Sequence, residues 1–121
     1  MPHDFPAQRL VAYRVCREVL VDFVDFVERW PRGWADLRDQ GKRSTTSVLL
    51  NLAEGASQPA DGKAKARHYA IALASLGESA AVVDAASALR LNRPDEAVQL
   101  NTKMKRLGAL IGGLLRSAKR R

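Results

Sequence analysis

Apolar residues recur at steps of three and four along most of this chain, and that spacing is the strongest constraint on its fold. The most regular stripe lies near the C-terminal end and is formed by Ala97, Leu100, Met104, Leu107, Ile111 and Leu114. Steps of three and four place side chains on one face of an α-helix. No stretch shows the alternation of apolar and polar residues that is typical of a β-strand. The pattern therefore predicts an all-α protein.

Prolines, glycines and short polar segments divide this pattern into four helices. We expect the helices at roughly 7–30, 35–56, 63–90 and 95–118, within a single domain that spans residues 1–121. Long amphipathic helices joined by short loops pack with each helix antiparallel to the one before it. The predicted fold is an antiparallel up-down-up-down four-helix bundle.

The first expected helix carries more apolar residues than one stripe needs. Beside the main stripe runs a second row, which consists of Val11, Val15, Val19, Val24 and Phe26. Apolar surface beyond the needs of one core often marks a contact with another molecule. We expect this row to be buried against another subunit, so the protein should be a homo-oligomer.

Cysteine usage and the absence of long apolar runs indicate the compartment. Cys16 is the only cysteine and lies on an apolar helix face, which favours a buried thiol in a reducing environment. No basic segment followed by a continuous apolar run stands at the N-terminus, so we expect no signal peptide. Uninterrupted apolar runs are far shorter than the ~20 residues that span a bilayer. These features predict a cytoplasmic protein without a membrane segment.

A short polar segment interrupts the apolar pattern of the second expected helix. It runs from Asn51 to Gly55 and reads Asn-Leu-Ala-Glu-Gly. Polar groups inside a packed helix are costly unless they find partners. We therefore predict that Asn51 and Glu54 are at least partly buried and hydrogen-bonded to another helix. Ser75 and Glu78 are the matching polar residues of the third expected helix.

The same polar residues do not form a pattern typical of an enzyme. A catalytic carboxylate needs a base, a nucleophile or a metal at a suitable spacing, and none is present. A carboxylate pair of Glu54 and Glu78 would need a Glu-x-x-His motif to resemble a ferritin-type metal site, and neither His3 nor His68 supplies one. We expect no catalytic residue, no metal and no cofactor.

The net charge of +7 belongs to the second half of the chain. Residues 1–60 hold eight Lys or Arg and eight acids, whereas residues 61–121 hold twelve and five, an excess of 12 − 5 = 7. Such asymmetry indicates a polyanionic partner, although a basic protein with a solvated tail would show it too. The candidate nucleic-acid-binding residues are Lys42, Arg43, Lys63, Lys65, Arg67, Lys103, Lys105, Arg106, Arg116 and Lys119.

The cluster at the start of the third expected helix needs a specific explanation. Lys63, Lys65 and Arg67 oppose the positive end of the helix dipole there, so an anion would account for them. Bases that contact phosphates bind without sequence preference and with strong salt dependence. Because few aromatic residues are available for base stacking, we expect recognition of the nucleic-acid backbone or shape.

Three short motifs resemble one known family. They are Lys42-Arg43 followed by Ser47, the segment from Asn51 to Gly55, and Ile71-Ala72 followed by Ser75-Leu76 and Glu78. Together they resemble the bacterial 23S rRNA-intervening sequence proteins, to which the accessory variability determinants of diversity-generating retroelements are related. The resemblance extends from about Leu10 to Ser117. It implies a basic four-helix bundle that forms a ring-shaped homopentamer, binds nucleic acid and has a protein partner such as a reverse transcriptase.

Two functions fit these observations. The first is a non-catalytic, oligomeric accessory protein that binds RNA or an RNA–DNA duplex. The alternative is a structural or protein-interaction bundle whose basic surface binds an acidic protein partner. Both predict a charged surface rather than an active-site cleft.

Overall fold

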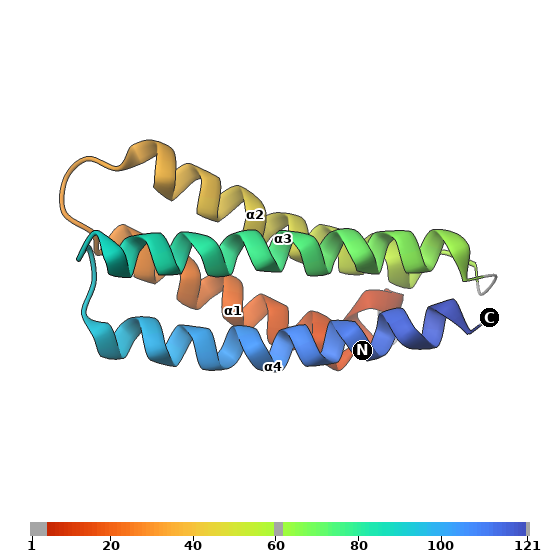
Figure 1. Cartoon of the computed structure of the whole chain (residues 1–121). Helices are drawn as coiled ribbons and strands as arrows, with labels where there is room; N and C mark the ends of the chain where they lie inside the picture. Colours follow the sequence, from red (N-terminus) through yellow and green to blue (C-terminus); the bar gives the residue numbers. More distant parts are fainter. Residues whose placement is uncertain (1–4, 60–61, 121) are drawn as a thin grey trace.

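The computed structural model describes residues 5–59 and 62–120, and these residues form an antiparallel four-helix bundle (Figure 1). No strand occurs among them. The elements are a 3-10 turn, η1 (Pro6–Arg9), and four α-helices, α1 (Val11–Glu28), α2 (Ala35–Ser57), α3 (Lys63–Ala88) and α4 (Pro94–Lys119). The predicted all-α fold is confirmed.

Each helix packs against its two neighbours around the bundle. α2 lies beside α1 and α3, and α4 lies beside α3 and α1, while the diagonal pairs have no Cα atoms within 8 Å of each other in the described part of the chain. Consecutive helices run in opposite directions, which gives the up-down-up-down arrangement (Figure 1). α2 and α3 make the most extensive contact. The N-terminal half of α2 inclines away from α3 toward the α1–α2 loop (Figure 1).

The first helix differs from its expected range of 7–30. Pro6 opens the separate turn η1, where Gln8 Oε1 accepts a hydrogen bond of 2.8 Å from the backbone N–H of Phe5. Leu10 is extended, and α1 begins only at Val11. α1 then ends at Glu28, before Pro31, because a helix cannot continue normally into a proline. The other three helices lie close to their expected ranges.

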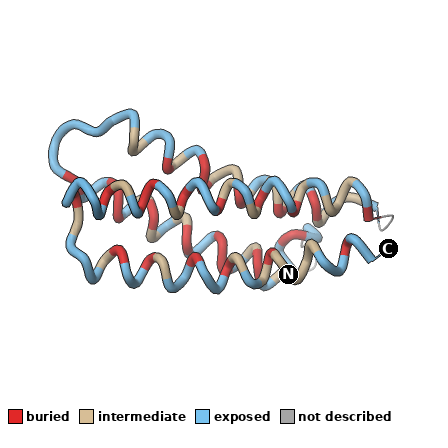
Figure 2. The backbone as a smooth tube through the Cα atoms, viewed as in Figure 1, coloured by how far each residue is buried: buried red, intermediate tan, exposed pale blue. Residues whose placement is uncertain are grey.

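The second apolar row of α1 is buried inside the bundle. Val15, Val19 and Phe26 are buried, Val24 is half-buried, and only Val11 is exposed. α1 packs against α2 on one side and α4 on the other, so its buried face must be wider than one stripe. Figure 2 shows the buried positions on the inward faces of the helices. The interpretation of this row as a contact with another subunit was therefore wrong.

The core confirms a second expectation, the buried thiol. Cys16 lies in the hydrophobic core with Phe23, Leu52 and Leu107, and it has no solvent exposure. Burial raises the pKa of the Cys16 thiol to about 12, because an ionised sulfur would lose its hydration there. The thiol is therefore protonated and packed at neutral pH.

Small residues let α2 approach its neighbours closely. A methyl group built on Gly41 would lie 2.6 Å from Phe23 Cε1 of α1, and one on Gly55 would lie 2.6 Å from Tyr69 Cε1 of α3. Both distances are shorter than a normal carbon–carbon contact. Close packing through the small middle of α2, as its composition indicates, follows from these two glycines.

Arg38 of α2 holds the end of α1 in place, a role that the sequence analysis did not predict. Its guanidinium donates to the carbonyl oxygens of Val27 at 2.9 Å, Trp30 at 3.1 Å and Pro31 at 2.6 Å, and also to that of Gly33. The last carbonyls of a helix lack intrahelical partners. Arg38 supplies such a partner to the carbonyl of Val27 in the last turn of α1, and its other bonds, to Trp30, Pro31 and Gly33, tie the α1–α2 loop to α2.

α3 is unusually apolar for a helix of this bundle. By length and composition it could cross a membrane, although one third of its most apolar window is buried inside the bundle. Core helices of soluble proteins can have the same length and the same apolar composition. Part of the apolar surface of α3 remains exposed, including Ile71.

Candidate nucleic-acid interface

A ladder of hydrogen-bonded side chains fills the seam between α2 and α3. At its buried end, the Ser79 hydroxyl lies 2.7 Å from Ser44 Oγ and 2.8 Å from Thr45 Oγ1. Ser44 and Thr45 also donate to the carbonyl of Gly41, at 3.0 and 2.9 Å. Ser79 connects onward through the carbonyl of Ser75. Hydroxyls are small enough to fit where the two backbones are close.

The outer end of the ladder contains Asn51. Ser47 Oγ lies 2.9 Å from Ser75 Oγ, and Asn51 Nδ2 donates to the carbonyl of Ser47 at 2.9 Å. Asn51 Oδ1 lies 3.1 Å from His68 Nδ1 of α3. Because an amide oxygen can only accept, His68 must carry its proton on Nδ1. The structural roles predicted for Asn51 and Ser75 are thus confirmed, with Ser47 and His68 as the connecting residues.

The same prediction is wrong for the two glutamates. Glu54 and Glu78 are exposed, and no hydrogen bond or ion pair joins either of them to another residue in the described part of the chain. The seam is closed by Gly55 against Tyr69 and by hydroxyl groups, so it has no room for a carboxylate. Both glutamates therefore point outward.

Two of the candidate bases are paired with acids. Lys42 forms an ion pair with Glu28, whose pKa is lowered mainly by the hydrogen bond from Lys42. Lys103 forms an ion pair with Asp22, and this hydrogen bond raises the pKa of Lys103. Neither lysine presents an uncompensated charge to an approaching phosphate.

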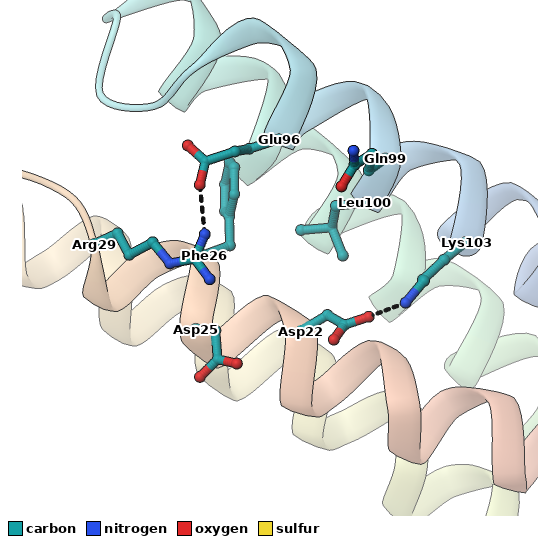
Figure 3. Close-up of a pocket in the computed structure, with 8 residues that line it drawn as sticks. All are labelled: Asp22, Asp25, Phe26, Arg29, Glu96, Gln99, Leu100 and Lys103. Atoms are coloured by element: carbon teal, nitrogen blue, oxygen red, sulfur yellow. Dashed lines mark hydrogen bonds and ion pairs between the residues drawn. The ribbon is translucent and has the colours of Figure 1, made fainter.

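Lys103 lines a pocket between α1 and α4 that holds charges of both signs (Figure 3). Its volume is about 170 Å³. Arg29 donates to Glu96 at 2.6 Å, and Asp25 and Gln99 complete the polar wall (Figure 3). Acids of the pocket already neutralise both of its cations. This pocket does not attract a polyanion.

Lys65 binds the end of the preceding helix. Its Nζ donates to the carbonyls of Gly55 at 2.6 Å and Ala56 at 3.3 Å, and it lies 5.7 Å from the centre of the Tyr69 ring. A cation at a helix C-terminus is favourable because the carbonyls there carry partial negative charge. The dipole of α2 thus explains Lys65, and an anion is not needed.

The remaining bases gather at one end of the bundle, where α3 begins and α4 ends (Figure 1). Phe23 of α1 lies beside Gly41 of α2, and Asp22 of α1 pairs with Lys103 of α4. Since these contacts belong to the second half of α1, its first turns and η1 lie at the end where α3 begins and α4 ends. We call this surface the basic end. Its exposed bases are Arg9, Arg14, Arg17, Lys63, Arg67, Arg116, Lys119 and Arg120. The described acids among the turns that carry these bases are Glu54 and Glu18, and Glu18 lines one groove together with Arg14 and Arg17.

The basic end includes residues that the sequence analysis missed. Arg9, Arg14 and Arg17 belong to the charge-neutral first half of the chain, so the charge count gave no reason to select them. Arg14 donates to the carbonyl of Gln8 at 3.1 Å and keeps the rest of its guanidinium exposed. Conversely, Lys105 and Arg106 are exposed in the middle of α4, away from this end, and Arg43 lies in the opposite half of α2.

The fold, the hydroxyl seam and the charge distribution define a basic, antiparallel four-helix bundle protein. The sequence model of one family of such bundles matches residues 8–113. This chain belongs to the family of 23S rRNA-intervening sequence proteins. A search among curated proteins returned no match to it. The matched region contains Lys63 and Arg67 of the basic end and stops before Arg116 and Lys119.

Proposed function

We propose that this protein is a non-catalytic, oligomeric accessory protein that binds RNA or an RNA–DNA duplex through its basic end. The observation that supports the proposal is the gathering of eight exposed bases from three helices and η1, where they outnumber the described acids Glu18 and Glu54. Closely spaced cations release counterions from a phosphate backbone when they bind it. No exposed aromatic cluster accompanies them in the described turns, so contact with backbone phosphates is favoured over base stacking.

The test compares two triple variants that remove equal charge from different places. The basic-end variant is Lys63→Gln, Arg116→Gln and Lys119→Gln. The control is Lys42→Gln, Lys105→Gln and Arg106→Gln, which lie outside the basic end. Fluorescence anisotropy with an RNA hairpin, duplex DNA and polyglutamate is measured over a salt series, with melting curves as a check on folding.

We expect the basic-end variant to bind every nucleic acid more weakly. Each lost contact should reduce the slope of log affinity against log salt by about 0.7–0.9. The control should retain most of the parental slope. Equal losses in both variants would show that net charge alone drives binding and would refute the site. Preference for polyglutamate over RNA would favour the alternative, a bundle that binds an acidic protein.

The remaining parts of the proposal concern assembly, partner and compartment. A homo-oligomer, for which the resemblance implies a pentamer, would repeat the basic end and raise the affinity through multivalency. We also propose a cytoplasmic location and a protein partner such as a reverse transcriptase, as in the related retroelement proteins. Co-purification of the tagged protein with nucleic acid and with a polymerase, with and without nuclease, tests this partnership.

A further inference from the structure

One aromatic side chain stands exposed at the basic end. Phe5 directly precedes η1 and is 73% exposed, more than any other large apolar residue that the structure describes. The other described aromatic residues of this end are Tyr13, which is half-buried, and Tyr69, which is buried. Trp34, which is 44% exposed, lies at the opposite end of the bundle, where α2 begins. Single exposed apolar residues are common on protein surfaces, so the surroundings of Phe5 decide its meaning.

Hydrogen bonds hold the backbone of Phe5 in place. Its N–H donates to Gln8 Oε1 at 2.8 Å, and its carbonyl oxygen accepts from the N–H of Gln8 at 3.0 Å. η1 lies beside both α1 and α2, and Ala7 within it is buried. The Phe5 ring is therefore carried by an ordered turn. A group that is already positioned loses less conformational freedom when it binds a ligand.

Cations without nearby acids surround this ring. Arg14 donates to the carbonyl of Gln8 at 3.1 Å, and Gln8 is also the residue that binds the backbone of Phe5. The exposed guanidinium of Arg14 therefore stands close to Phe5. Residues 5–17 contain three arginines and no acid, and the first acid after them is Glu18. An exposed aromatic ring thus stands at the edge of a positively charged surface.

The Phe5 ring makes no stacking contact within the described part of the chain. The ring–ring and cation–ring contacts there are formed at Phe23, Phe26, Trp30 and Tyr69. A free ring among cations suits a ligand that has both negative charge and flat apolar faces. Nucleic acids combine these features in their phosphates and nucleobases. Unpaired nucleobases can be splayed out and stacked on an aromatic side chain, whereas those inside a duplex are already stacked.

We propose that Phe5 stacks on an unpaired nucleobase of an RNA whose phosphates are bound by the basic end. This inference rests on the proposed function and narrows its ligand to RNA with an unpaired base, such as a hairpin loop or a single-stranded end. Phosphate contacts still supply most of the affinity, because the described basic end offers eight Lys and Arg side chains but one exposed aromatic ring. Phe5 adds selectivity for the unpaired base.

An anionic membrane also offers negative charge and an apolar phase, but it fits Phe5 less well. Interfacial membrane anchors present a continuous apolar face along an amphipathic helix. η1 has four residues, and its one apolar side chain besides Pro6 is Ala7, which is buried. It therefore offers no such face beside Phe5. A single ring with flanking cations matches one stacked nucleobase with flanking phosphates more closely.

The first experiment separates stacking from charge. Fluorescence anisotropy compares an RNA hairpin with a blunt RNA duplex that has the same number of phosphates. Phe5→Ala should weaken binding to the hairpin roughly 5- to 100-fold, the range expected for one stacked base, and leave binding to the duplex unchanged. The salt slope for the hairpin should stay at the parental value, because no cation is removed.

The second experiment removes the proposed partner from the RNA. A hairpin with abasic loop nucleotides should bind the parent protein as weakly as the ordinary hairpin binds Phe5→Ala. Combining the abasic loop with Phe5→Ala should then cause no further loss, because both changes remove the same contact. Additive losses would show that the loop bases and Phe5 act independently, and would overturn the stacking contact.

Matched variants test whether the aromatic ring itself is needed. Phe5→Tyr keeps a flat ring and should retain the preference for the hairpin, whereas Phe5→Leu keeps the apolar bulk and should lose most of it. Trp34→Ala removes the exposed ring at the other end of the bundle and should leave hairpin binding unchanged. Melting curves check that every variant folds. Parental hairpin binding by Phe5→Leu would show a merely apolar contact and would overturn the proposal.

The remaining outcomes keep this inference separate from the proposed function. Salt-dependent RNA binding that is equal in the parent and in Phe5→Ala would overturn the stacking role alone. Absent RNA and DNA binding by the parent would overturn the proposed function, and the stacking role with it. Sedimentation of the parent with anionic lipid vesicles, lost in Phe5→Ala while hairpin binding stays unchanged, would assign Phe5 to a membrane surface and overturn the inference.

Discussion

Gly41→Ala should destabilise this protein, although alanine normally stabilises a helix. The new methyl group would lie 2.6 and 2.7 Å from two ring carbons of Phe23 and 3.0 Å from Val82 Cγ1. Normal carbon contacts are about 3.5–4.0 Å, so α2 and the ring must separate by roughly 1 Å. Phe23 has no solvent exposure and lies in the hydrophobic core. Overpacking of this kind costs about 1–3 kcal/mol.

The gain in helix propensity offsets only part of that cost. Glycine to alanine inside a helix contributes about 1 kcal/mol of stability. Working from the upper part of the overpacking range, we expect a net loss of about 1–2 kcal/mol in the free energy of unfolding. Gly77→Ala is the matched control, because no atom lies within 4 Å of its added methyl group. It should gain about 1 kcal/mol.

Urea unfolding monitored by circular dichroism measures both variants. The midpoints should move in opposite directions, with the slope unchanged if the unfolded state is unaffected. Phe23→Leu combined with Gly41→Ala provides a further check, since the smaller side chain should relieve the clash and make the double variant more stable than additivity predicts. Midpoints that rise together in Gly41→Ala and Gly77→Ala would refute the close approach of α1 and α2.

Three further predictions concern single side chains. Asn51→Leu should lower the free energy of unfolding by about 1–3 kcal/mol, because Ser47 and His68 lose their partner. Glu54→Ala, at an exposed site, should change the free energy of unfolding little. Chemical denaturation of both variants measures the two values. Arg38→Lys should lower the melting temperature by several degrees, since an ammonium cannot satisfy the same set of carbonyls, and a melting temperature equal to the parent's would contradict that role. Cys16 should react with a thiol reagent at pH 8 only as fast as the protein opens, because burial raises its pKa to about 12. Immediate labelling of the folded protein would contradict the burial of Cys16 in the core.

The surface ion pairs contribute less to the fold than these buried contacts. Lys42 with Glu28 and Lys103 with Asp22 are largely exposed, and pairs of this kind typically contribute about 0–1 kcal/mol. Their importance lies in charge compensation. They neutralise two bases that a count of residues would assign to nucleic-acid binding.

Most of the architecture follows from the sequence, because helical periodicity is a local property. Steps of three and four along α4, from Ala97 to Leu114, define its buried face whatever it packs against. The position of Cys16 on an apolar helix face likewise predicts its burial, and the small residues of α2, such as Gly41, predict its close packing. A polar Asn51 inside an apolar pattern likewise had to find a partner.

Only the tertiary structure decided which bases are available. Lys65 became a cap for α2 and Lys103 a partner of Asp22, because the register between helices brings those groups together. The same register leaves Glu54 outside the seam and carries Arg14 to the end where α4 finishes. Pairings between helices depend on how the helices are rotated and shifted against one another. Sequence spacing fixes the face of each helix but not these relations, so the basic end emerges only in the folded bundle.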